Sequence, residues 1–240
     1  MNIISKIAII GAMECELEDI KKDLSDLKEN NYADLKIFTG TINGKSVILA
    51  QCGVGKVNAA LNTQYMIDTY RPDIIINTGV AGGIAEELNI GDIVIGTYLV
   101  QHDFDVSALG YARGYMCTGI EKDKPTKYYC DEELINKFQS SLKQNMPSSK
   151  IHKGIIASGD KFISCTKTKK EINEYFGAIA VEMEGCAVAQ VATKNKIPFV
   201  ITRAISDLAD GKTAQYQNDF EKEISAVSTQ TIKIFLRNLQ

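Results

Sequence analysis

The chain has 240 residues, 45% of them hydrophobic and 24% charged, a balance that predicts an ordinary globular domain with a substantial core. Its formal net charge is −3, so the charge balance gives no reason to expect a nucleic acid or an anionic membrane as a partner. No stretch is long and apolar enough to span a bilayer, and the apolar run Ile7–Met13 lacks a signal-peptide cleavage pattern.

The first part of the chain alternates between strands and helices. Apolar residues at helical spacing predict a helix over Cys15–Leu27, and Asn43-Gly44 predicts a hairpin turn between two strands. A glycine-rich loop is expected at Thr78–Gly83, directly after a buried strand. The other elements expected here are strands at Lys6–Gly11, Leu35–Ile42, Ser46–Gln51, Ile74–Asn77 and Ile93–Val100, and a helix at Lys56–Tyr70 that Pro72 ends.

Periodicity disappears between His102 and Lys127. An irregular segment this long within a compact domain is typically a functional loop. It contains three glycines and three aromatic residues, Phe104, Tyr111 and Tyr115. We expect these aromatic side chains to be exposed and to suit an interface with a second copy of the chain.

The second part of the chain continues the alternation. Ala178–Asp210 is expected to form a strand, a helix that opens at Glu182–Glu184, and a second strand at Phe199–Ile205. The pattern predicts an α/β fold: a single domain, residues 1–240, with a central mixed, largely parallel β-sheet flanked by helices on both faces. The remaining elements expected are a strand at Lys153–Ser158 and helices at Asp131–Gln144, Lys167–Tyr175 and Phe220–Leu239, the last with an apolar stripe of Phe220, Ile224, Val227, Ile234 and Phe235.

Charged residues cluster near the ends of the two strands in Ala178–Asp210. Ligands of open α/β sheets bind outside the carboxyl ends of the strands, so Glu184, Arg203 and Asp207 are expected at one crevice. Arg203 lies within an apolar strand, where an unpaired guanidinium would be costly, so it needs a carboxylate or a bound anion. Ion-paired surface acids are the simpler alternative, but a buried set of acids with an arginine favours a functional site.

Three further stretches have a functional and a structural interpretation. Gly53–Val57 resembles a phosphate-binding loop only weakly, because Ala50 and Val57 replace residues that such a loop requires, and a structural turn is preferred. The glycines after Ile76 form either a tight turn or a ligand cradle. Glu14 is expected to face water in a first helical turn, whereas Glu16 either does the same or turns into the crevice.

The cysteines and histidines argue against disulfides and metal. Six scattered cysteines without a CxxC pair predict reduced thiols in a cytoplasm rather than a disulfide framework. The only histidines are His102 and His152, without paired spacing, so no zinc site is expected. We expect no cofactor.

Seven segments together resemble the 5′-methylthioadenosine/S-adenosylhomocysteine nucleosidases, which belong to the purine nucleoside phosphorylase superfamily. The resemblance extends over nearly the whole chain, in order and with family-like spacing. The segments are IIGAMECE (9–16), INTGVAGG (76–83), GDIVI (91–95), HDFDVSALGY (102–111), SGDKFI (158–163), AVEMEG (180–185) and RAISDLAD (203–210).

The resemblance implies hydrolysis of the N-glycosidic bond of 5′-methylthioadenosine and S-adenosylhomocysteine, and also of 5′-deoxyadenosine, in methionine salvage and removal of a methyl-transfer by-product. Asp207 is similar to the family's general acid at N7 of adenine, with Ser206 in support. Glu16 matches the carboxylate that activates water, Glu184 the clamp on the ribose hydroxyls, and Arg203 the residue near Glu184 and the water. Matches to other substrate-binding positions are Met183, Phe162 (stacking on adenine), Ile163 (through its backbone), and Ala81 and Gly82 beneath the sugar.

These residue types suit the chemistry. Adenine is a poor leaving group as an anion, so a carboxylic acid such as Asp207 should protonate it as the bond breaks. A nearby carboxylate can stabilise the oxocarbenium charge of the sugar. Water attacks from the opposite face, as in inverting glycosidases, and Glu16 is expected there.

Several alternatives stay open at this point. Phosphorolysis on the same fold would need a cationic cradle, and Glu14 and Glu16 argue against one. A nucleoside-binding sensor would not need both Glu16 and Asp207, and a futalosine-type substrate is a further alternative. Positions that depart from the family's pattern are Val80 in place of a small polar residue, Leu109 in place of an aromatic, and Met116-Cys117 in place of a proline-like segment. The resemblance also implies a homodimer, with residues 102–127 near the partner's site.

Overall fold

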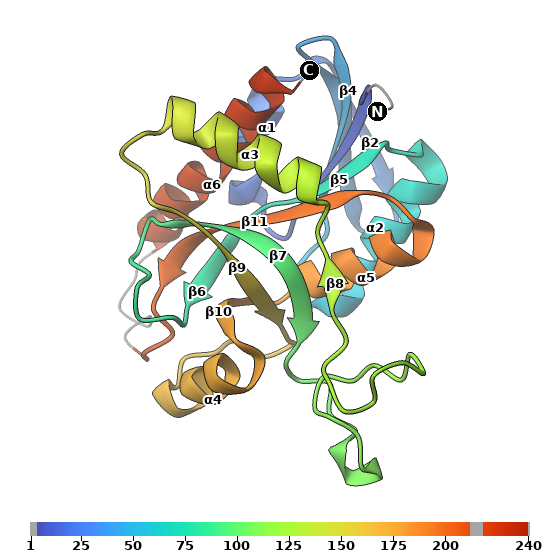
Figure 1. Ribbon diagram of the computed structural model, residues 1–240. Coiled ribbons are helices and arrows are strands. Elements are labelled where there is room, and N and C mark those ends of the chain that lie inside the picture. The colour runs from blue at the N-terminus through green and yellow to red at the C-terminus, as the bar shows by residue number, and fades with distance from the viewer. Residues whose placement is uncertain (1–3, 212–217, 240) are drawn as a thin grey trace.

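A single mixed sheet runs through the protein (Figure 1). The computed structural model describes residues 4–211 and 218–239. The strands lie in the order β2-β3-β4-β1-β5-β11-β6-β10-β9-β7-β8. Their bounds are β1 (Lys6–Gly11), β2 (Ser25–Tyr32), β3 (Leu35–Ile42), β4 (Lys45–Gln51), β5 (Ile74–Asn77), β6 (Val80–Gly83), β7 (Ile93–Gln101), β8 (Tyr128–Tyr129), β9 (Ile151–Ser158), β10 (Ala178–Glu182) and β11 (Phe199–Asp207).

Strand β11 joins the two halves of this sheet. Its first residues, Phe199–Ile201, pair in parallel with β5. Strand β5 pairs with β1, and β1 pairs with β4, both in parallel. Further along, β11 pairs with both β6 and β7. Because β6 pairs with β10, β10 with β9 and β9 with β7, these five strands close on one another. The carboxyl end of β11 therefore lies inside the most enclosed part of the sheet.

Helices cover both faces, as the alternating pattern predicts. The long helices α3 (Glu132–Asn145) and α6 (Asn218–Asn238) pack together on one face, where the rings of Phe138 and Phe235 stack with centroids 4.6 Å apart. Helices α2 (Lys56–Tyr70) and α5 (Gly185–Asn195) pack together on the other face. The shorter elements are α1 (Glu18–Lys22), α4 (Thr166–Phe176) and the 3-10 turns η1 (Glu14–Glu16) and η2 (Ser107–Leu109). Among the described residues, no helix is long and apolar enough to cross a membrane.

Many of the predicted elements are confirmed. The bounds of β3, β5 and α2 are the predicted ones, and Asn43 and Gly44 turn the β3–β4 hairpin with φ of 51° and 75°. Helix α2 ends at a left-handed Arg71, directly before Pro72. In α6, Ile224, Ile234 and Phe235 are buried and Val227 is partly buried. Phe220 lies outside the residues whose side chains the structure describes.

The predicted helix Cys15–Leu27 is wrong. Only a 3-10 turn and the short α1 form, and the chain then enters the exposed edge strand β2, which pairs with β3. Leu24 and Leu27 continue the helical spacing, but hydrogen bonding to the free edge of β3 overrides this local pattern.

Two other predictions need correction. Part of the expected loop Thr78–Gly83 is strand β6, because its glycines let it fit beside β11: a Cβ on Gly83 would lie 3.1 Å from Ile205. Glu182 is the last residue of β10, and α5 begins only at Gly185.

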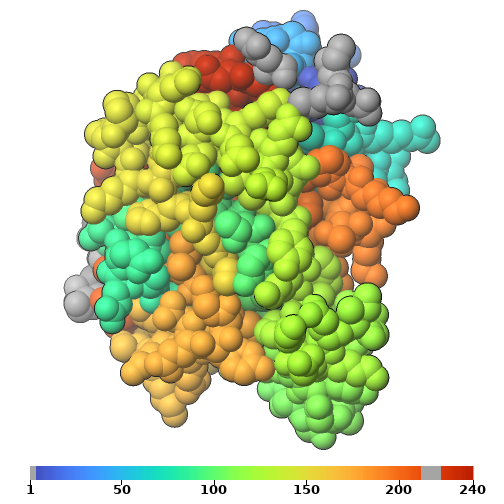
Figure 2. Space-filling model, in the orientation of Figure 1, coloured from blue at the N-terminus to red at the C-terminus, as the bar shows by residue number. Residues whose placement is uncertain are grey.

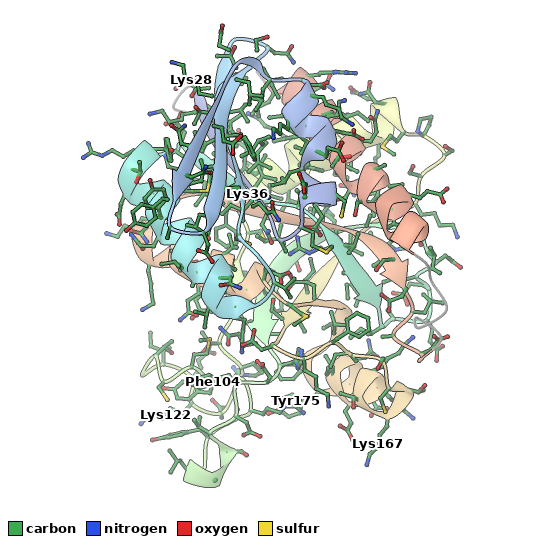
Figure 3. All side chains as sticks on the ribbon, turned by 180° about the vertical axis from the view of Figure 1, so that it is seen from behind. Lys28, Lys36, Phe104, Lys122, Lys167 and Tyr175 are labelled. Atoms are coloured by element: carbon green, nitrogen blue, oxygen red, sulfur yellow. The ribbon has the colours of Figure 1, made fainter. Side chains whose placement is uncertain are left out.

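The irregular segment 102–127 projects from the body of the protein beside α4 (Figure 2). Phe104 and Lys122 lie on this projection, and Tyr175 of α4 lies beside it (Figure 3). The expectation of three exposed aromatic residues is wrong. Tyr115 is buried, and its hydroxyl oxygen accepts a hydrogen bond from the Gly119 N–H at 2.7 Å, while Phe104 and Tyr111 are half-buried. The large apolar side chains exposed there are Leu109 and Ile120, at 71% and 72%.

Candidate active site

One cavity of about 240 Å³ lies at the carboxyl ends of β1, β10 and β11. It is the place where parallel strands of an α/β sheet present their ligand-binding residues. Four acids line it: Glu16, Glu182, Glu184 and Asp207. The other lining residues are Ala12, Met13, Val54, Val80, Ala81, Gly82, Lys161, Phe162, Ile163, Val181, Met183 and Ser206.

Glu16 turns inward from η1 and is held by main-chain groups. Its Oε2 accepts hydrogen bonds from the N–H groups of Ala12 at 2.7 Å and Met13 at 2.9 Å, and its Oε1 from Val80 at 3.2 Å. Gly79 has a φ of 152°, and a Cβ there would collide with Glu16 Oε1. Burial raises the pKa of Glu16, although these hydrogen bonds and the charge of Arg203 act in the opposite direction.

Asp207 lies at the last position of β11, on the wall formed with β6. Its Oδ1 accepts a hydrogen bond from the Ala209 N–H at 2.8 Å, and its Oδ2 from the Ser206 hydroxyl at 3.0 Å. The same hydroxyl lies 3.3 Å from the carbonyl oxygen of Ala81. Gly82 leaves space for the carboxyl group, since a Cβ there would be 3.1 Å from Oδ1. Asp207, at the end of β11, and Glu16, in η1, thus border the same cavity.

Glu184 lies in the turn between β10 and α5. Its Oε1 accepts a hydrogen bond from the Gly55 N–H at 2.8 Å, at the start of α2. Burial raises the pKa of Glu184 to about 7, and the negative charge of Glu182 adds to this effect. The charge of Glu184 therefore changes near neutral pH.

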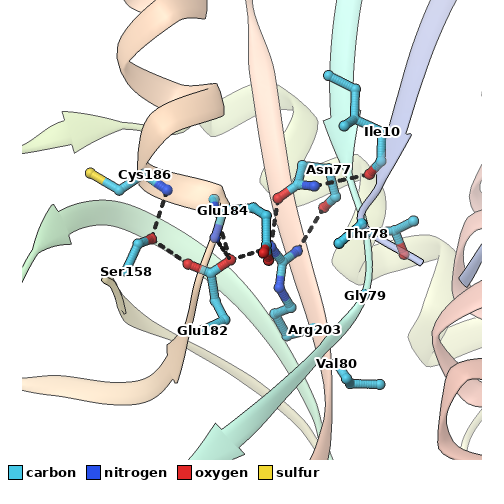
Figure 4. Close-up of polar contacts among 12 residues, drawn as sticks. Ile10, Asn77, Thr78, Gly79, Val80, Ser158, Glu182, Glu184, Cys186 and Arg203 are labelled. Atoms are coloured by element: carbon cyan, nitrogen blue, oxygen red, sulfur yellow. Dashed lines mark hydrogen bonds and ion pairs between the residues drawn. The ribbon is translucent and has the colours of Figure 1, made fainter. Parts of the chain in front are cut away.

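Arg203 is not one of the lining residues of the cavity, and Figure 4 shows its polar contacts. Its guanidinium pairs with the carboxylate of Glu182. It also donates to Asn77, at 2.6 Å to the side-chain oxygen, and to the main-chain oxygen of Thr202 at 2.8 Å. The expectation that Arg203 has a carboxylate partner is confirmed, but that partner is Glu182.

Glu182 is a candidate functional residue that the sequence did not single out. The sequence pattern placed it only at the start of the expected helix. Its Oε2 accepts hydrogen bonds from the N–H groups of Glu184 at 3.1 Å and Gly185 at 2.7 Å, and Ser158 donates to its Oε1 (Figure 4). Ser158 also accepts from the Cys186 N–H at 2.7 Å. Ser158 ends β9 and lies opposite Glu182 in the register of β10. A polar residue at the end of that apolar strand is the sequence signal that could have indicated a buried, hydrogen-bonded Glu182.

The remaining predicted substrate-binding residues also reach the cavity. Ala81, Gly82, Met183 and Ser206 line its walls, while Phe162 and Ile163 lie on the loop between β9 and α4. Ile163 is buried, whereas Phe162 is 57% exposed. Val54, from the turn that resembled a phosphate loop, and Met13 line the cavity but were not predicted. Within residues 4–211 and 218–239, no group of three or more His, Cys, Asp or Glu side chains is placed to hold a metal ion.

The fold and this cavity define a class of protein. The family model described as "Phosphorylase superfamily" matches residues 6–240, which is nearly the whole chain. The chain therefore belongs to this superfamily.

The relatives narrow the class. A 5′-methylthioadenosine/S-adenosylhomocysteine nucleosidase of Staphylococcus carnosus is 40% identical over 97% of this chain and 100% of its own length. The solved structure of such a nucleosidase from Neisseria meningitidis, in complex with methylthio-immucillin-A, has a TM-score of 0.92 and 35% identity, covering 98% of this chain and 100% of that one. The chain belongs to the 5′-methylthioadenosine/S-adenosylhomocysteine nucleosidase family of this superfamily. A structure of the futalosine hydrolase of Helicobacter pylori is also similar, with a TM-score of 0.91 and 30% identity over 98% of this chain and 99% of that one.

Replacing Arg203 by methionine should strongly destabilise the protein. The change leaves the buried Glu182 carboxylate without its cation, which typically costs about 3–5 kcal/mol. The free energy of unfolding in urea measures this cost. The matched control is Arg237→Met, on an exposed position of α6. We expect Arg203→Met/Glu182→Met to be less destabilised than Arg203→Met alone, and a loss for Arg203→Met no larger than for Arg237→Met would contradict this account.

Proposed function

We propose that this protein hydrolyses the N-glycosidic bond of 5′-methylthioadenosine and S-adenosylhomocysteine, releasing adenine and the 5′-thio-substituted ribose. The observation that carries the proposal is that Glu16, from the turn η1, and Asp207, from the end of β11, line a single cavity. The nucleosidase of S. carnosus, at 40% identity, supports the choice of substrates. The family's general acid and water-activating carboxylate match these two residues in the sequence.

The Asp207 carboxyl group is suited to assist the departure of adenine. As the C1′–N9 bond breaks, its electron pair goes to adenine and N7 takes the proton of Asp207. Ser206 supports both states of this carboxyl group. Its hydroxyl can donate to the ionised Oδ2, or to the carbonyl oxygen of Ala81 when Oδ2 carries the proton. Phe162 and Ile163 provide the wall against which the purine ring can stack.

Glu16 and Glu184 act on the sugar and the water in this proposal. Glu184 accepts hydrogen bonds from the ribose hydroxyl groups, next to the charge that develops in the transition state. Water attacks C1′ from the face opposite adenine and gives its proton to Glu16, so the hydroxyl group remains on the sugar. The three N–H groups around Glu16 fix its orientation before the substrate binds. Arg203 contributes indirectly, by neutralising Glu182.

Phosphorolysis on the same fold is disfavoured by the charges of the cavity. Phosphate recognition needs cationic or N–H donors around the anion. Four of the lining residues are acids, and Lys161 is the one cation among the described residues of the lining. A phosphate beside Glu16 would meet a carboxylate whose nearest N–H donors are already used.

Futalosine is a second candidate substrate. The observation that favours it is the similarity of the H. pylori futalosine hydrolase, at 30% identity over nearly the full length of both chains. The relatives at higher identity are named for the thioadenosine substrates, so we propose those first. Comparing kcat/KM for futalosine, 5′-deoxyadenosine and the two thioadenosines ranks the candidates.

Asp207→Asn and Glu16→Gln should each lower kcat for 5′-methylthioadenosine by at least about 10²-fold, because each removes one proton-transfer group. Adenine release in phosphate-free buffer, followed by chromatography, measures the effect. Glu14→Gln is the matched control, since Glu14 is exposed at the start of the same 3-10 turn. Near-normal turnover of Asp207→Asn would remove this residue from its role.

The pH dependence of kcat/KM should report Glu184. With a pKa of about 7, its carboxyl group is mostly protonated below that pH and ionised above it. The ionised form is the better acceptor for two hydroxyl groups, so kcat/KM should rise as the pH increases through about 7. Glu184→Gln should remove this rising limb while leaving a lower, flatter profile. An unchanged limb in the variant would assign the titration to another group.

We further propose a cytoplasmic homodimer. The six cysteines, all among the described residues, are reduced thiols, which is consistent with a reducing compartment. Exposed apolar side chains lie on the projecting segment, at Leu109 and Ile120, and on α2, at Val57 and Leu61, and each is costly to leave in water. Light scattering at micromolar concentration should give twice the mass of the chain. A monomer at that concentration would contradict the dimer and leave the chemistry above unaffected.

A further inference from the structure

The turn Gly53–Val57, which weakly resembles a phosphate-binding loop, leads into helix α2. Carboxylates of this chain accept the hydrogen bonds of the first N–H groups there. Helix α2 begins at Lys56, and its first free N–H groups would be the donors for a phosphate. The Gly55 N–H donates to Glu184 Oε1 and the Lys56 N–H to Asp160 Oδ1, both at 2.8 Å. One of these carboxylates belongs to the proposed ribose clamp, and the other begins the loop that carries Phe162.

The side chain of Lys56 joins three segments of the chain. Its Nζ donates to Asp103 Oδ1 at 2.5 Å and to Gln101 Oε1 at 3.1 Å, at the end of β7, and lies 3.7 Å from Asp160 Oδ2. Asp103 accepts in turn from the Asp160 N–H at 2.7 Å. Only 17% of the Lys56 side chain is exposed, so its ammonium group is more shielded from water than in a typical surface ion pair, whereas its partners Asp103 and Asp160 are 27% and 50% exposed.

The loop after Asp160 forms one wall of the cavity. Lys161, Phe162 and Ile163 line it, but Phe162 is 57% exposed, so the surrounding residues cover less than half of it. The preceding residue, Gly159, is also tied down, because its N–H donates to the Glu182 carbonyl oxygen at 3.1 Å. The position of the Phe162 wall therefore depends on anchors at residues 159 and 160.

We propose that Lys56 is a positioning residue for the nucleoside. It holds the Phe162 loop through Asp160, next to the Gly55 N–H that binds Glu184, so it sets the adenine wall of the cavity beside the proposed ribose clamp. Its described partners do not include Glu16 or Asp207. This role rests on the proposed nucleosidase function and predicts an effect on binding rather than on the chemical step.

The test is Lys56→Met, with Lys22→Met as its matched control. Lys22 also pairs with two carboxylates, Glu18 and Asp19, but on an exposed turn away from the cavity. KM and kcat for 5′-methylthioadenosine and the Kd of adenine from calorimetry are measured for each variant. We expect Lys56→Met to raise both KM and the adenine Kd about tenfold and to leave kcat within about threefold. Lys22→Met should have the same KM, kcat and adenine Kd as the unmodified protein.

A second variant tests the same proposal if Lys56→Met folds poorly. Asp160→Asn keeps an acceptor for the Lys56 N–H but removes the ion pair, so it should raise the adenine Kd by less than Lys56→Met. The proposal is overturned if the variants leave the adenine Kd unchanged, or if kcat falls while that Kd does not rise. A protein that binds adenine but releases none from 5′-methylthioadenosine would instead refute the proposed function, because the adenine measurement needs no turnover.

Discussion

The guanidinium of Arg203 is a buried cation on which the site depends. It lies on β11, the strand shared by both halves of the sheet, and only 2% of the residue is exposed. Removing such a charge from water costs several kcal/mol unless the chain supplies an anion and hydrogen-bond acceptors. Glu182 and Asn77 supply them. Glu182 also accepts hydrogen bonds from the N–H groups of Glu184 and Gly185. The carboxylate that neutralises Arg203 therefore also fixes the turn that carries Glu184 into the cavity.

The other acids of the cavity are oriented by the main chain. Glu16 accepts three N–H groups, and Asp207 and Glu184 each accept one, from Ala209 and Gly55. Such fixed donors cost no reorganisation during the reaction, which is the usual source of electrostatic catalysis. This arrangement requires close approach of the backbone, and Gly79 beside Glu16 and Gly82 beside Asp207 allow it. The segment 79–82, which runs into β6, thus lies against both the Glu16 and the Asp207 carboxylates.

Much of this arrangement could be predicted from the sequence, because it depends on local patterns. The crevice at the strand ends and the need of Arg203 for a carboxylate follow from the apolar strands and the charged residues near their ends. The same pattern left open whether Glu16 faces water or the crevice, and only the family resemblance placed it at the site. The choice of Glu182 as the partner could not be predicted, since it depends on how β10 is set against β11. Strand β2 was missed because its pairing with the edge of β3 is a tertiary effect. The cluster of Lys56, Asp103 and Asp160 joins residues far apart in the sequence, and no local pattern indicates it.

The central claim is that Glu16 and Asp207 lie on opposite sides of one nucleoside. A crystal structure of Asp207→Asn soaked with 5′-methylthioadenosine tests it most directly, because the slow variant should retain the intact substrate. The account predicts N7 of adenine within about 2.6–3.2 Å of the residue 207 side chain, and a water molecule between Glu16 and C1′ on the other face of the sugar. Adenine bound away from residue 207, or both side chains on the same face of the ribose, would contradict it.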